Sequence, residues 1–99
     1  MNAKGKKPET KALFESILAL ETLEECQLFF DDLCTVSELS AMSQRISVAK
    51  MLRQNMVYSD IAAKTGASSA TISRVARCLN YGDGGYNIVL DRTEPEENK

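Results

Sequence analysis

The run from Tyr58 to Arg77 constrains this chain more than any other segment, because its residue types are spaced for two short helices joined by a tight turn. The inner faces of both helices need apolar or small residues where the helices cross, and the corner needs a left-handed backbone. The sequence supplies both requirements together: Ile61, Ala62, Ile72, Val75 and, at the corner, Gly66. This pattern predicts a helix-turn-helix.

The outer face of the second helix carries short hydroxyls, methyls and guanidinium groups: Ser68, Ser69, Ala70, Thr71, Ser73, Arg74 and Arg77. Such groups suit base edges, thymine methyls and phosphates, so we expect them to contact DNA. Neither arginine has an acid at pairing distance along its own helix. We expect Lys64 and Arg53 to contact phosphates. A plain helical hairpin in a bundle explains the apolar positions equally well, but not this outer face.

Charge is distributed unevenly along the chain although the net charge is only −2. Residues 1–11 sum to +3, residues 12–43 to −7, residues 44–78 to +5 and residues 79–99 to −3. The positive segment holds six basic residues against Asp60 alone, and it contains the whole predicted helix-turn-helix. This coincidence favours double-stranded DNA as a partner, with binding that weakens as salt rises.

Several function classes are excluded by residues that the chain lacks. It has no histidine, no pairing of a nucleophile with a base and no glycine-rich phosphate loop, so we expect no enzyme, no cofactor and no metal. No apolar run is long enough for a membrane span or a secretory signal, so we expect a cytoplasmic protein. The three cysteines are odd in number and scattered, which favours buried structural thiols: Cys26, Cys34 and Cys78.

Periodicity predicts an all-α chain of five or six helices, with a tail over residues 1–8, a domain over residues 9–92 and a charged tail over residues 93–99. Pro8 suits the first turn of a helix that ends near Leu20. Capping boxes at Thr22 and Thr35 begin a second helix and a longer third one that ends near Asn55. Two short helices complete the motif, while residues 88–90 are compatible with a helical turn, a strand or a docked tail.

The stretch from Thr35 to Asn80, together with the Tyr-Gly-Asp-Gly-Gly-Tyr tail that follows, resembles the Trp repressor superfamily and most of all its TrpR-like YerC/YecD branch. The resemblance is most specific from Ile61 to Tyr86. It implies an intertwined homodimer with a helix-turn-helix at each end. It also implies that the first residues of the second motif helix, from Ser68 to Ser73, meet the major groove.

The same resemblance implies an effector site. In Trp repressors, tryptophan lies between an arginine of the long helix and one of the reading helix, which correspond here to Arg45 and Arg74. The next residue is glycine in those proteins, whereas this chain has Val75, whose branched side chain would crowd an indole. This departure argues against tryptophan as the corepressor.

We therefore expect a sequence-specific DNA-binding regulator, a repressor in type, that acts as a dimer on a near-palindromic operator. Two alternatives stay open. The chain could be a helical module that binds another protein, which its acidic segment and a pI of about 5.1 would suit. It could also be a regulator that responds to a small molecule other than tryptophan.

Overall fold

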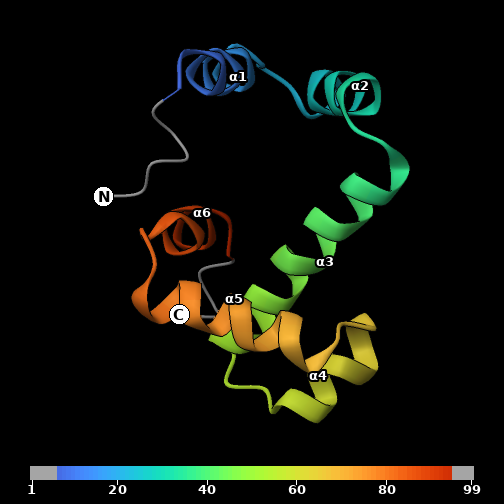
Figure 1. The fold of residues 1–99 in the computed structure, drawn as a ribbon, viewed down its shortest axis with the longest axis vertical. Coiled ribbons are helices and arrows are strands. Elements are labelled where there is room, and N and C mark those ends of the chain that lie inside the picture. Colours follow the sequence, from blue (N-terminus) through green and yellow to red (C-terminus); the bar gives the residue numbers. More distant parts are fainter. Residues whose placement is uncertain (1–6, 95–99) are drawn as a thin grey trace. The chain divides into compact units, whose positions relative to one another are not determined.

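The computed structural model describes residues 7–94, and within that range every regular element is an α-helix (Figure 1). The helices are α1 Pro8–Leu18, α2 Leu23–Leu33, α3 Val36–Arg53, α4 Tyr58–Thr65, α5 Ser69–Tyr81 and α6 Gly85–Thr93. The all-α prediction is confirmed, and the segment around residues 88–90 is part of a sixth helix. Residues 1–6 and 95–99, on which most of both expected tails fall, lie outside the described range.

The predicted capping box forms in full at Thr35, and at Thr22 one of its two bonds forms. At the start of α3, Thr35 Oγ1 accepts from the Glu38 amide at 3.0 Å, and Glu38 Oε1 accepts from the Thr35 amide at 2.8 Å. At the start of α2, Thr22 Oγ1 accepts from the Glu25 amide at 3.0 Å, while the Glu25 carboxylate reaches one residue further back, to the Glu21 amide at 2.8 Å. These bonds satisfy amides that have no partner within the helix, which is why α2 and α3 begin where they do.

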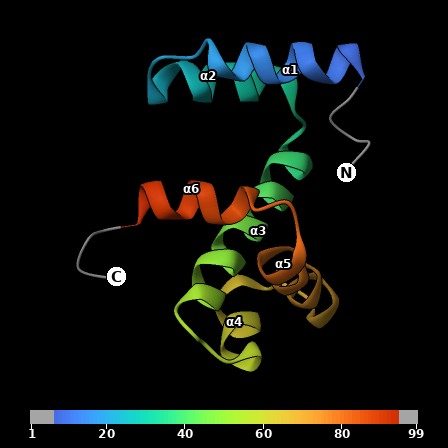
Figure 2. The ribbon, with the colours of Figure 1, turned by 90° about the vertical axis from the view of Figure 1, so that its left-hand side faces the viewer.

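The chain divides into two compact units, Met1–Leu39 and Ser40–Lys99, with the division inside α3. In the first unit, neither α1 nor α2 contains a buried residue. Figure 2 shows both of these helices lengthwise. Their large apolar side chains are exposed in the single chain: Leu13, Phe14, Leu18, Leu23, Leu28 and Leu33. No residue from 7 to 39 is buried, so the described part of this unit has no core within one chain.

The second unit contains the core. The buried residues come from α3, α4, α5, α6 and the turn before α5: Val48, Ala49, Ile61, Ala67, Ile72, Val75 and Leu90. Within this unit α5 packs against both α4 and α6 (Figures 1 and 2). The predicted inner faces are confirmed, because Ile61, Ile72 and Val75 are buried and Ala62 packs against them. The core thus fixes α4 and α5 as one motif.

A residue in the left-handed conformation follows α3, and another follows α4. Gly66 follows α4 with φ 75°, as the sequence predicted, and its amide donates to Ala62 O at 2.8 Å. Asn55 follows α3 with φ 62°, and the amides of Asn55 and Met56 donate to Leu52 O at 3.0 Å and Met51 O at 3.1 Å. These two bonds form a Schellman motif, which stops α3 and turns the chain into α4.

The cysteines differ from expectation. Cys26 and Cys34 are half-buried, but Cys78 is exposed, so the prediction of a buried thiol is wrong for Cys78 in the single chain. Cys78 lies about 60° around α5 from Val75 and about 120° from Ile72, so it flanks the buried side of the helix without belonging to it. Across residues 7–94, no helix combines the length and the apolar content needed to cross a bilayer.

Candidate nucleic-acid interface

The N-terminus of α5 is built by Ser68. Its Oγ accepts from the Thr71 amide at 3.1 Å and donates to Thr71 Oγ1 at 3.1 Å, so Ser68 is the N-cap of α5. The sequence predicted both residues as base contacts. In the structure the two hydroxyls are hydrogen-bonded to each other at the start of the helix, where Ser68 is exposed and Thr71 is half-buried. Their first role is to define where α5 begins.

The remaining predicted residues of α5 form one exposed surface, which we call the reading face: Ser69, Ala70, Ser73, Arg74 and Arg77. At 3.6 residues per turn, four of these positions fall on the side of the helix opposite Ile72 and Val75, while Ser69 lies at the edge of that side. Within residues 7–94, neither arginine makes an ion pair or a hydrogen bond through its guanidinium group. The reading face therefore offers two free cations and two hydroxyls to solvent.

Lys64 lies in the last turn of α4 and is also exposed. A lysine there is close to the turn that leads into α5, and its flexible side chain acts as a point charge toward phosphate oxygens. Its position is consistent with the expected phosphate contact.

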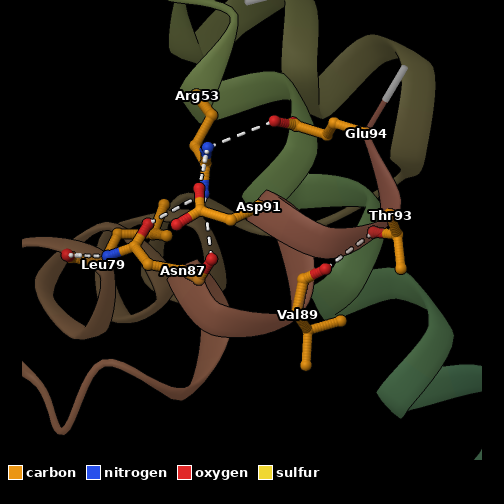
Figure 3. Close-up of polar contacts among 7 residues, drawn as sticks. All are labelled: Arg53, Leu79, Asn87, Val89, Asp91, Thr93 and Glu94. Atoms are coloured by element: carbon orange, nitrogen blue, oxygen red, sulfur yellow. Dashed lines mark hydrogen bonds and ion pairs between the residues drawn. The ribbon is translucent and has the colours of Figure 1, made fainter. Parts of the chain in front are cut away.

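Arg53 differs from the other predicted cations because it forms ion pairs with an acid of α6 and with the C-cap residue of that helix. Its Nη2 lies 2.7 Å from Asp91 Oδ1 and 3.2 Å from Glu94 Oε1, and its side chain is only 25% exposed (Figure 3). One guanidinium among two carboxylates leaves a local excess of negative charge, which is unfavourable for a phosphate. We therefore assign Arg53 to the contact between α3 and α6 and leave it out of the reading face.

The two residues expected to hold an effector differ in exposure. Arg45 is half-buried on α3 and Arg74 is exposed on α5. Val75 is 2% exposed and belongs to the core. A surface cavity of about 490 Å³ does exist in this unit, but other residues line it: Leu52, Arg53, Asn55, Tyr58, Ala76, Leu79, Asn80 and Asn87.

Two residues that the sequence did not single out support the motif from outside it. Gln44 of α3 donates from Nε2 to Thr65 O at the end of α4, at 3.1 Å. Asn87 of α6 donates from Nδ2 to Leu79 O near the end of α5, at 3.1 Å. The bonded residues are 21 and 8 positions apart in the sequence. No helical spacing or turn signature covers such separations, so the sequence could not have indicated these bonds.

Comparison with known proteins decides the family. The profile of the family described as Trp repressor protein matches residues 8–94. The chain belongs to the Trp repressor family. That match covers all six helices, and the family comprises regulators and not enzymes.

Relatives within the family agree with the fold. The uncharacterized protein YerC of Bacillus subtilis is 55% identical over 89 residues, which cover 90% of this chain and 86% of YerC. The crystal structure of a TrpR-like protein from Eubacterium eligens is 54% identical, with a TM-score of 0.87 over 92% of this chain and 94% of that one. A Staphylococcus aureus structure, described as a candidate Trp repressor, is 49% identical, with a TM-score of 0.87 over 94% and 93% of the two chains. The YerC-like branch of the family is thereby confirmed.

Proposed function

We propose that this protein is a sequence-specific DNA-binding repressor that acts as a homodimer, with α5 as its reading helix. The observation that carries the proposal is the reading face, whose arginines are exposed and unpaired within residues 7–94. Guanidinium groups bind guanine and phosphate, and short hydroxyls bind either bases or phosphates. We propose that Lys64 contacts phosphate. The proposed contacts of α5 and its N-cap with bases or phosphates are Ser68, Ser69, Ala70, Thr71, Ser73, Arg74 and Arg77.

Electrostatics supports the same surface. With Arg53 neutralised by α6, the segment from residue 44 to residue 78 keeps five basic residues against Asp60, a net charge of +4. The seven acids between positions 12 and 43 precede this segment in the sequence. A local positive segment is what attracts the phosphate backbone, and counterion release then makes affinity fall steeply with salt.

Dimer formation is supported by the first unit. Val36 at the start of α3 is 87% exposed, Leu18 is 83% exposed and Leu23 is 76% exposed in the single chain. Large apolar side chains that stay this exposed in a single chain suit burial against a partner. A second copy of the chain would bury these side chains, and a two-fold axis would then relate the two reading helices. Half-sites would then lie roughly 34 Å apart, in a near-palindromic operator.

Selection from a random duplex library tests the proposal. We expect enrichment of a motif with dyad symmetry, whose affinity, measured by fluorescence anisotropy, falls as salt rises. A motif without dyad symmetry would contradict the dimeric operator. No enrichment at any salt concentration would contradict DNA binding as a whole and would favour the protein-binding alternative.

The family resemblance implies tryptophan as the effector, and our proposal about the effector differs on this point. Val75 fills the position after the reading-helix arginine and is buried, so we propose that tryptophan does not serve as corepressor. A thermal-shift screen over metabolites addresses this directly. Stabilisation by tryptophan at low concentration would overturn it, whereas stabilisation by another small molecule would identify a different effector.

A further inference from the structure

In the last turn of each motif helix, a backbone carbonyl accepts a hydrogen bond from a side-chain amide of another helix. The last four carbonyls of an α-helix have no partner within the helix. Thr65 O is such a carbonyl at the end of α4, and it accepts from Gln44 Nε2 of α3 at 3.1 Å. Leu79 O is such a carbonyl near the end of α5, and it accepts from Asn87 Nδ2 of α6 at 3.1 Å.

The second amide is itself held by α3. Arg53 Nη1 donates to Asn87 Oδ1 at 3.2 Å and to Asn87 O at 3.4 Å, while Nη2 pairs with Asp91 and Glu94 (Figure 3). An amide group is planar, so a donor that holds Oδ1 also fixes the direction of Nδ2. The guanidinium plane is equally rigid. A continuous set of bonds therefore runs from Arg53 through Asn87 to Leu79.

We propose that Gln44 and Asn87, the latter held by Arg53, are positioning residues that set the orientation of α5 on α3 for DNA binding. The inference rests on the proposed function. Leu79 lies two residues after Arg77, and Thr65 lies four residues before Ser69, so the two amides hold the motif on either side of the reading face. Base contacts tolerate little displacement, because hydrogen bonds weaken steeply with distance and angle.

The alternative is that both amides merely add stability to the fold. The two roles differ in what they do to specific and non-specific binding. A misoriented α5 loses base contacts but keeps its cations, so only specific affinity falls. A less stable protein loses active molecules, so specific and non-specific affinity fall in the same proportion.

The experiment compares Asn87→Ala and Gln44→Ala with the wild-type protein and with Thr93→Ala as the matched control. Thr93 also belongs to α6, but its hydroxyl donates to Val89 O within the same helix, at 2.9 Å, and does not reach α5 (Figure 3). Anisotropy is measured on the selected duplex and on a scrambled duplex, at a temperature where circular dichroism shows each variant to be folded. None of the three substitutions changes charge.

We expect Asn87→Ala and Gln44→Ala to weaken binding to the selected duplex about tenfold, the value of about one base contact. Binding to the scrambled duplex should stay unchanged, and Thr93→Ala should behave as the wild type. Equal losses on both duplexes, or no loss on either, would overturn the inference. Gln44→Ala carries the test independently if Asn87→Ala does not fold. If the wild type itself does not distinguish the two duplexes, the proposed function has failed, which is a separate result.

Discussion

Gly66 forms the corner between α4 and α5 with φ 75° and ψ 5°, a region that residues with a side chain avoid. A Cβ built at this position meets no atom within 4 Å, so any effect of substitution comes from the backbone alone. We expect Gly66→Ala to lower the free energy of unfolding by about 1 to 2 kcal/mol, measured by urea denaturation.

Gly85 provides the control for that measurement. It is the first residue of α6, its φ is not in the left-handed region, and a Cβ there also meets open space. Gly85→Ala should therefore leave stability unchanged or raise it slightly, because alanine favours the helix. Equal destabilisation by both substitutions would contradict the conformational explanation.

The ionisation of Glu38 makes the stability of the α3 N-terminus depend on pH. Hydrogen bonds from the Thr35 amide and then from the Thr35 side chain lower the pKa of Glu38 below its ordinary value of 4.5. A carboxyl whose pKa is lower in the folded state stabilises the fold when ionised, so its contribution is present at neutral pH. That contribution is lost as pH falls below about 4.5, the pKa of the unfolded chain.

We expect Glu38→Gln to reduce the loss of stability between neutral pH and acid, measured by thermal melts across that range. Glu24→Gln is the matched control, since Glu24 is also exposed in the first turn of a helix but makes no capping bond within residues 7–94. If both variants show the same dependence on pH as the wild type, the capping bond does not contribute to acid sensitivity.

At the scale of an element, α5 has a buried side and an exposed side. Ile72 and Val75 face the core, and the arginines face solvent. A substitution on the reading face should therefore change binding without changing stability, because exposed positions contribute little to the fold.

Arg77→Ala tests this separation. We expect weaker binding to the selected duplex by about 1 to 3 kcal/mol if Arg77 contacts guanine, together with relaxed preference at one base pair. If it contacts phosphate, the slope of log affinity against log salt should fall by about 0.9. Arg92→Ala, an exposed arginine of α6, is the control and should change neither quantity. Full affinity and an unchanged slope for Arg77→Ala would remove this residue from the interface.

Most elements could be predicted from the sequence because their signals are local. Capping boxes at Thr22 and Thr35, the glycine at the turn and the apolar periodicity each depend on residues within about one or two helical turns. The exception is α6, Gly85–Thr93, where a short segment after a glycine-rich loop has too little periodicity to identify a helix. Its stabilising contacts come from Arg53 and Leu79, which are distant in sequence.

The whole molecule raises the question of what covers the first unit. A lone chain that leaves the apolar side chains of α1 and α2 in water has little to hold those helices in place, since packing supplies most helical stability in proteins. We expect sedimentation equilibrium to give about twice the mass of 10.9 kDa for one chain.

Leu23→Glu tests whether this apolar surface is the interface. Leu23 is 76% exposed and begins α2, where an acid suits the helix terminus, so a single chain should tolerate the change. In a dimer that buries this position, the unpaired charge should shift the mass toward the monomer. Gln27→Glu adds the same charge at another exposed position of α2 and is the control. A monomeric wild type, or an unaffected Leu23→Glu dimer, would contradict this assignment.

The sequence by itself determined the all-α class and the two motif helices with their corner at Gly66, because helix caps, turns and apolar periodicity depend on neighbouring residues. Only the tertiary structure decided which cations are free. Arg53 and Arg77 look alike as basic residues on helices, yet Arg53 is held by Asp91 and Glu94 while Arg77 faces solvent. The bonds of Arg53, Gln44 and Asn87 join residues that are more than one helical turn apart in the sequence. At such separations the tertiary fold, and not local spacing, decides which groups meet.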